Sequence, residues 1–219
     1  MKKILFIIPC IPYPLTTGGN QAFFHMVDYL RCRMSVSILL YPKGKEKEDV
    51  EKLKRIWNNV DFFIFTEQMA EPETRHPSYY KWLKKIALSA TRKMRRQLLT
   101  YSKDVVCRDM TLDSSFFEPL PSKYAEYIST VSRRGFDIIQ VEFYPLISLG
   151  YLLPENVQTI FVHHELRYVR NENEMEFLER VTDEERMLYR IGKDFEHSAL
   201  KTYKHVIVLT EVDRQILID

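Results

Sequence analysis

The sequence has few cysteines and no long apolar run, and both shortages narrow the class of protein. Cys10, Cys32 and Cys107 are odd in number and widely spaced, which fits neither a disulfide framework nor a zinc site. The apolar run at residues 4–8 ends at a series of prolines and is too short for a signal-peptide core or a membrane span. These features favour a protein of a reducing cytoplasm.

Several motifs of cofactor and catalytic sites are also missing. No G-x-G-x-x-G and no G-x-x-x-x-G-K-[ST] occurs, so neither NAD nor ATP is supported, and no G-x-S-x-G nucleophile elbow is present. The adjacent His163 and His164 lack the i, i+4 spacing of a helical zinc pair, and there is no Asp-x-Asp. We therefore expect no metal and no resident cofactor.

Charge of neither sign dominates, because 32 basic and 30 acidic side chains leave a formal net charge of +2. A global field that would attract a nucleic acid is absent, and no nucleic-acid partner is expected. With 219 residues, of which 45% are hydrophobic and 28% charged, the chain is long enough to bury a full core as one large α/β domain or two small ones.

Short apolar runs alternate with amphipathic helical patterns along the chain. The apolar runs predict strands at 4–8, 35–41, 60–65, 136–141, 157–162 and 205–209. Helical periodicity predicts helices at 20–31, from 45 onward, and at 122–132, 144–153, 171–203 and 212–218. Because parallel strands need long right-handed connections, this rhythm predicts an α/β fold: a Rossmann-like, doubly wound, mainly parallel sheet with crossover helices.

Local signals refine two of these helices. Asn20 is expected to cap the first helix, and Asn171 with Glu174 has the spacing of a capping box at the start of the long helix 171–203. Ile191 is expected on the inward face of that long helix.

A stretch of about 67–134 interrupts the rhythm and predicts a helical insertion without a strand. Its segment 81–103 contains basic residues and no acidic ones, with apolar residues at helical spacing. Three interpretations stay open: the helix packs its apolar stripe on the core and solvates its charges, it lies on an anionic membrane at the inner face, or it binds an anionic ligand. The membrane-facing candidates are Lys84, Lys85, Arg92, Lys93, Arg95 and Arg96.

Polar residues gather where the predicted strands end. In a parallel sheet these ends share one edge, where ligands of α/β folds bind, and a helix N-terminus there attracts an anion. The candidate residues are Gly18, Gly19 and Asn20, then Glu142, then His163, His164 and Glu165, and finally Thr210 and Glu211.

Each candidate also has a structural explanation that stays open. Consecutive histidines at a strand end point to opposite faces, so at most one of His163 and His164 enters a given cleft. Glu142 and Glu211 either take part in the site or cap the helices that follow. Gly18 and Gly19 either serve a turn at positive φ or let a ligand approach the backbone.

Four stretches together resemble a known family. They are KKILFIIPCIPYPLTTGGNQ, FDIIQVEF, FVHHELR and FEHSALKTYKHVIVLTEVDRQIL. In order and spacing they are similar to the N-terminal domain of glycosyltransferases with two facing Rossmann-like domains, in the large retaining family 4. The resemblance implies that the backbone of Gly18, Gly19 and Asn20 lies near the donor phosphates or the acceptor hydroxyl, and that a histidine of the 163/164 pair orients the transferred sugar. It also implies that Thr210 and Glu211 occupy the family's Ser/Thr-Glu position.

The resemblance also implies what this chain alone does. Residues 1–219 would form a single N-terminal domain, and the C-terminal domain that binds the nucleotide-sugar donor would be absent from it. The expected function is the acceptor-binding half of a retaining, metal-independent transferase acting on a glycan or lipid-linked acceptor, inactive alone. The alternative is a non-catalytic Rossmann-like module that binds a glycan or a protein, and a dinucleotide enzyme is disfavoured by the missing glycine motif.

Overall fold

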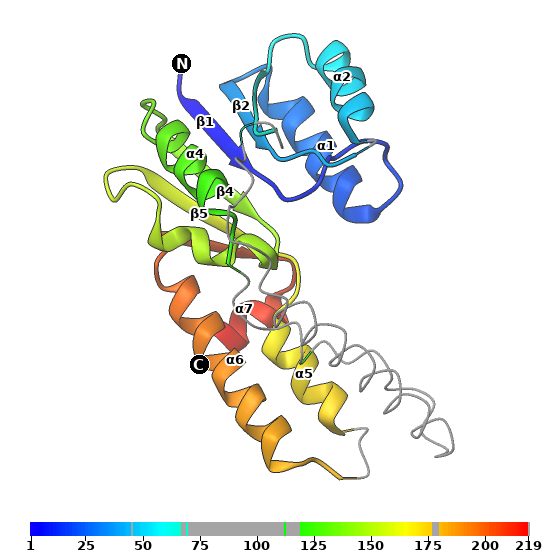
Figure 1. The fold of residues 1–219 in the computed structure, drawn as a ribbon, viewed down its shortest axis with the longest axis vertical. Helices are drawn as coiled ribbons and strands as arrows, with labels where there is room; N and C mark the ends of the chain where they lie inside the picture. The colour runs from blue at the N-terminus through cyan, green and yellow to red at the C-terminus, as the bar shows by residue number, and fades with distance from the viewer. Residues whose placement is uncertain (45, 67–68, 70–111, 113–118, 177–179, 219) are drawn as a thin grey trace, which may run out of the picture. The chain divides into compact units, whose positions relative to one another are not determined.

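A six-stranded sheet in which every strand is parallel to its neighbours organises the described part of the chain (Figure 1). The computed structural model describes residues 1–44, 46–66, 69, 112, 119–176 and 180–218. The strands are β1 (Lys3–Ile7), β2 (Ser35–Leu40), β3 (Asp61–Ile64), β4 (Ile138–Glu142), β5 (Gln158–His163) and β6 (His205–Val208). The helices are α1 (Gly18–Leu30), α2 (Glu46–Ile56), α4 (Ser122–Ser132), the 3₁₀ helix η2 (Tyr144–Tyr151), α5 (Arg167–Glu176), α6 (Asp183–Leu200) and α7 (Glu211–Ile218). The predicted Rossmann-like, doubly wound α/β class is confirmed.

The strand order, β3-β2-β1-β4-β5-β6, creates one point where the direction of winding changes. The chain moves from β1 outward through β2 to β3, and then returns to pair β4 on the other side of β1. The carboxyl ends of β1 and β4 therefore flank the topological switch point, the place where α/β sheets of this order bind their ligands.

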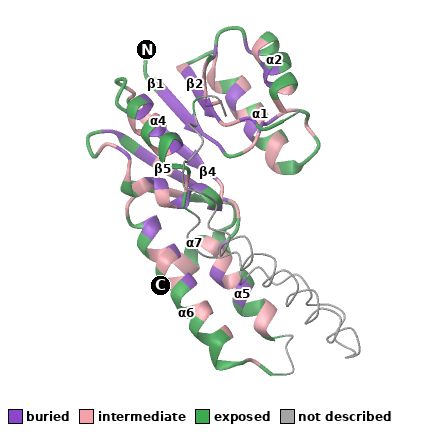
Figure 2. Cartoon of the chain, viewed as in Figure 1, coloured by how far each residue is buried: buried purple, intermediate pink, exposed green. Residues whose placement is uncertain are grey.

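The two faces of the sheet carry separate hydrophobic cores because side chains along a strand alternate between faces. On one face α1 and α2 cover Ile4, Phe6, Ile38 and Leu40. On the other face α4, η2 and the end of α6 cover the second core, and Figure 2 shows β1, β2, β4 and β5 as mostly buried. The second core includes Leu5, Ile7, Leu39, Ile139, Val141 and Phe161.

The predicted long helix 171–203 is wrong, because α5 ends at Glu176 and α6 begins only at Asp183, with 180–182 outside any helix. Asn171 lies inside α5 and is buried, so it is not at the start of a helix as expected. The real capping box follows later: Thr182 Oγ1 accepts the Glu185 N–H at 3.2 Å, and Glu185 Oε2 accepts the Thr182 N–H at 2.8 Å. The Thr-x-x-Glu signature was therefore present in the sequence and marks the true helix start.

The chain divides into two compact units. The first, residues 1–71, 117–166 and 194–219, contains the whole described sheet. In the second, 72–116 and 167–193, the ammonium of Lys193 lies 4.9 Å from the ring centre of Tyr168, while Ile191 is 49% exposed, contrary to its expected inward position. The helix predicted at 122–132 is confirmed as α4, and the basic segment 81–103 lies outside the described residues.

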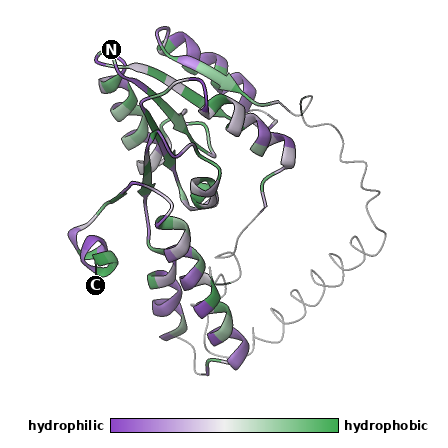
Figure 3. Cartoon of the chain, turned by 90° about the vertical axis from the view of Figure 1, so that its left-hand side faces the viewer, coloured by the Kyte–Doolittle hydropathy of each residue, from purple (hydrophilic) through white to green (hydrophobic). Residues whose placement is uncertain are grey.

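Helices of the described part carry hydrophilic and hydrophobic residues together, whereas the strands are mostly hydrophobic (Figure 3). None of these described helices combines the length and the apolarity that crossing a membrane requires.

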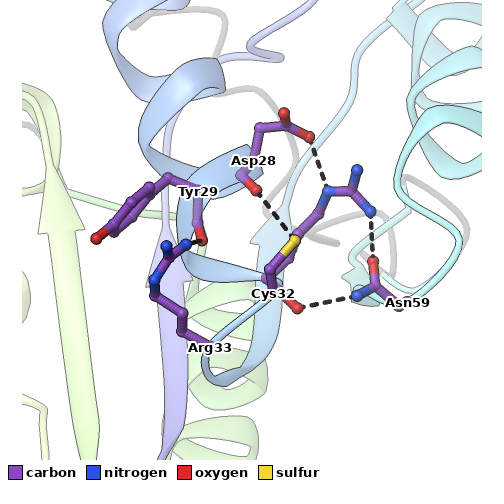
Figure 4. Close-up of polar contacts among 6 residues, drawn as sticks. Asp28, Tyr29, Cys32, Arg33 and Asn59 are labelled. Atoms are coloured by element: carbon purple, nitrogen blue, oxygen red, sulfur yellow. Dashed lines mark hydrogen bonds and ion pairs between the residues drawn. The ribbon is translucent and has the colours of Figure 1, made fainter.

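The C-terminal end of α1 is hydrogen-bonded to the turn before β3 (Figure 4). This end lies at the amino edge of the parallel sheet, whereas the switch point lies at the carboxyl edge. Arg31 Nε donates to Asp28 Oδ1 at 2.8 Å, and Arg31 Nη1 donates to Asn59 Oδ1 at 2.8 Å. Asn59 Nδ2 returns a bond of 2.9 Å to the Arg31 carbonyl oxygen. These bonds fix one end of α1, whose other end faces the candidate site.

Candidate functional site

Helix α1 begins with two glycines at the switch point. Thr17, and not Asn20 as expected, is the N-cap, since its Oγ1 accepts the Asn20 N–H at 3.2 Å. Asn20 Nδ2 instead donates to the Pro14 carbonyl oxygen at 3.4 Å and closes the loop after β1. Neither Gly18 nor Gly19 has a positive φ, so the turn explanation for these glycines is wrong.

The space around the two glycines differs. A Cβ added at Gly18 would meet no atom within 4 Å, whereas one at Gly19 would lie 3.5 Å from the Phe143 ring. Gly18 is also exposed. The N-terminus of α1 is thus open at Gly18, and its amide groups and helix dipole favour an anion there.

Phe143 follows β4 in an unusual backbone conformation, with φ 69°. A bulky residue at positive φ is a strained exception, and such residues cluster at functional sites. Its ring lies flat on the His164 ring, with centroids 4.2 Å apart and an interplanar angle of 8°. Phe143 therefore lies between the start of α1 and His164.

Glu142 is the last residue of β4 and is only 2% exposed. Its Oε2 lies 2.7 Å from His164 Nε2, and its Oε1 accepts a bond of 2.5 Å from Gln140 Nε2. The expectation that Glu142 caps the following helix is wrong, because η2 has no side-chain cap. The Glu142 carboxylate therefore fixes the position of the His164 ring through a hydrogen bond.

Strand register explains why these three side chains meet. Phe6 pairs with Gln140, and Glu142 pairs with Val162. Since side chains alternate along a strand, Gln140, Glu142 and His164 all point to the face covered by α1. Gln140 Nε2 accordingly lies 3.8 Å from the sulfur of Met26 in α1.

His163 points to the opposite face, as expected for consecutive residues. Its Nε2 lies 2.5 Å from Glu196 Oε1, and both side chains are 1% exposed. The ring packs against Phe161 and Tyr144 in the second core. His164, with 22% of its side chain exposed, is the histidine that reaches the switch point.

Three other candidate residues, Glu165, Thr210 and Glu211, are not part of this cluster. Glu165 is exposed beyond His164. Thr210 Oγ1 accepts the Asp213 N–H at 3.0 Å and so caps α7, and the hydrogen bond from Arg214 lowers the pKa of the exposed Glu211. These last two residues follow β6, which is two strands and therefore about 10 Å from β4, the strand of Glu142.

Sequence reasoning missed Gln140, Phe143 and Cys10. The i, i+2 spacing of Gln140 and Glu142 signalled a shared strand face, whereas nothing in the sequence marked Phe143 for a positive φ. Burial, followed by the negative charges of Glu46 and Glu142, raises the pKa of the Cys10 thiol. That thiol, in the loop after β1, therefore belongs to the electrostatic surroundings of Glu142.

Across the described ranges, no group of three or more His, Cys, Asp or Glu side chains is arranged to hold a metal ion. No family model matches the chain, and no curated protein and no solved structure matches it either.

Proposed function

We propose that the chain is the acceptor-side half of a retaining, metal-independent glycosyltransferase, which moves a sugar from a nucleotide-sugar donor to a glycan or lipid-linked acceptor. The observation that carries the proposal is the hydrogen-bonded pair of Glu142 and His164 beside the open N-terminus of α1. Both lie at the switch point of a parallel sheet, where such folds bind ligands. The type of reaction proposed for this site comes from the resemblance of the four sequence stretches to the glycosyltransferase family.

The N-terminus of α1 supplies the anion-binding part of the site. The donor diphosphate is the anion, and the backbone amides with the helix dipole stabilise its charge as the bond to the sugar breaks. Gly18 allows oxygen atoms to approach the backbone closely because no side chain stands in the way.

His164 supplies the sugar-binding part. Its partly exposed ring is fixed between Phe143 and Glu142, so it orients the transferred sugar without being able to turn away. The acceptor oxygen then bonds to the anomeric carbon from the face that the diphosphate leaves, and its proton passes to the departing diphosphate oxygen. The configuration at the anomeric carbon is therefore retained. The nucleotide is held by a second domain of the kind that the resemblance implies.

Nucleotide-sugar turnover tests the proposal in two proteins, the 219-residue chain and the two-domain protein that the proposal requires. We expect turnover only in the two-domain protein, and a loss of about 100-fold on His164→Ala, in the range of a removed orienting or acid–base group. Strong turnover by the 219-residue chain would overturn the division of roles. Absence of turnover in both proteins, with glycan or protein binding retained, would support the non-catalytic module instead.

A membrane-anchored acceptor would fit the basic segment 81–103, whose charged candidates lie outside the described residues. Co-sedimentation with vesicles of neutral lipid and of neutral lipid mixed with anionic lipid tests this part separately. Binding only to the anionic vesicles, lost at high salt, is the expected result. Equal behaviour with both vesicle types would remove the membrane from the proposal.

A further inference from the structure

The two oxygens of Glu142 are both engaged, and this fixes the proton on His164. A carboxylate accepts hydrogen bonds and donates none. Oε1 accepts from Gln140 at 2.5 Å, and Oε2 lies 2.7 Å from His164 Nε2. With Glu142 ionised, His164 Nε2 carries the proton in this bond, and in the neutral ring Nδ1 then keeps a lone pair.

We infer that Gln140 and Glu142 are positioning residues that hold His164 with Nδ1 as a hydrogen-bond acceptor for the ligand. This selects a ligand that donates a hydrogen bond, such as a sugar hydroxyl, because a lone pair repels a phosphate or carboxylate oxygen. The site then has two halves of opposite preference: the start of α1 takes the anion, and His164 takes the hydroxyl. The identity of the hydroxyl as a sugar's rests on the proposed function, whereas the position of the proton does not.

The surroundings of His164 hold the orientation of its ring as well as the position of its proton. Phe143 lies parallel to it at 4.2 Å and limits its rotation. Within the described part of the chain, the His164 ring has its hydrogen bond with Glu142 and its stacking contact with Phe143, and no hydrogen bond to Nδ1 is found there. Gln140 is 5% exposed and rests on Met26, so the carboxylate beneath the histidine is itself held by a buried amide.

Long-range proton–nitrogen correlation of the ¹⁵N-labelled 219-residue chain tests the inference directly. At mildly alkaline pH, His164 is expected as a single tautomer whose Nε2 proton is protected from exchange with water, and His164→Gln assigns the signals. Glu142→Ala should abolish the protected proton, while Glu142→Gln, which keeps an accepting oxygen, should restore it. Gln140→Leu should weaken the protection, and Glu155→Gln, at an exposed carboxylate away from the site, is the matched control.

Two results would overturn the inference: a proton on Nδ1 of His164 in the unchanged chain, or full protection of Nε2 in Glu142→Ala. The first needs no variant, so a misfolded Glu142→Ala protein would not prevent a decision. In the two-domain protein, Glu142→Ala should lower kcat about 10- to 100-fold and change KM for the donor much less, since loss of a supporting group misplaces a ligand-binding histidine. If the unchanged two-domain protein shows no turnover, the proposed function fails while the tautomer measurement still stands.

Discussion

His163 Nε2 lies 2.5 Å from Glu196 Oε1 in the protein interior, and this bond joins β5 to α6. The next residue, His164, points to the other face of the sheet and bonds Glu142. Two adjacent histidines thus have different tasks: the first belongs to the core, and the second belongs to the candidate site. Substitutions at the two positions should accordingly separate stability from function.

Replacing Glu196 with alanine should lower the free energy of unfolding by about 1–3 kcal/mol, because it leaves a buried imidazole nitrogen without its hydrogen-bond partner. His163 Nδ1 is already buried without a hydrogen bond in the described structure, so the ring has no second bond to compensate. Urea unfolding measures the change, and Glu155→Ala, at an exposed position, should stay within about 0.5 kcal/mol of the unchanged chain. A loss below about 1 kcal/mol for Glu196→Ala would contradict the role in the core.

Gly150 of η2 should not tolerate a side chain. A Cβ there would overlap Thr202 Oγ1 and lie 2.8 Å from a ring carbon of Tyr203, so the backbone or both neighbours would have to move. Gly150→Ala is expected to destabilise the protein by about 1–3 kcal/mol, the usual cost of overpacking. Thermal or urea unfolding checks this, and unchanged stability would show that η2 can shift away from the turn after α6.

Gly18→Ala, unlike Gly150→Ala, should leave stability intact and should instead lower turnover. A Cβ at Gly18 meets nothing within 4 Å, and alanine favours helix by up to about 1 kcal/mol over glycine, so stability should stay equal or rise. In the two-domain protein, turnover should fall about tenfold, because the added methyl group obstructs the approach of the donor to the start of α1. Unchanged turnover would remove Gly18 from the proposed site.

Cys10 should react slowly with an alkylating agent at neutral pH. Burial and the charges of Glu46 and Glu142 raise the pKa of its thiol, and the thiolate is the reactive form. Glu46→Gln removes one of these negative charges, lowers the pKa and so increases the rate of alkylation at any pH below it. Peptide mapping after timed exposure to iodoacetamide follows Cys10 alone; identical rates in both proteins would argue against an electrostatic effect of Glu46.

Stability should fall in alkali through Tyr203. Its hydroxyl donates to the Ile147 carbonyl at 3.0 Å, and burial raises the pKa of this side chain. A pKa raised by folding means that the stabilisation is complete below pH of about 10, the ordinary tyrosine value, and is lost as the pH rises from there toward the folded-state pKa. Tyr203→Phe should cost about 1 kcal/mol at neutral pH and reduce the slope above pH of about 10 in urea titrations. An unaltered slope would mean that Tyr203 does not titrate with unfolding.

Much of the fold could be read from local patterns. Each predicted strand lies within a residue or two of its observed position, since apolar runs of strand length bounded by turn residues have few other structures open to them. The single helix predicted at 171–203 is wrong because amphipathic periodicity continues across the break, whereas the capping box of Thr182 and Glu185 marks the true start of α6. The cap predicted at Asn20 of α1 is likewise wrong, because Thr17 is the N-cap.

The candidate site was only partly predictable. The sequence placed Glu142 and the histidine pair at the ends of neighbouring strands. It could not supply Gln140 as the support of Glu142, or the unusual backbone of Phe143 that lays its ring on His164. Both depend on what the neighbouring strand and α1 bring against them, and no local pattern records that.

The sequence by itself determined that the chain forms strands and crossover helices of a parallel sheet, and that His163 and His164 point to opposite faces. Which histidine meets Glu142 was decided only by the tertiary structure, through the register that pairs Glu142 with Val162. Side chains alternate with a period of two, so a slip of one residue between β4 and β5 would exchange the two histidines. Packing on both faces of the sheet sets that register, and packing involves residues far apart in the sequence.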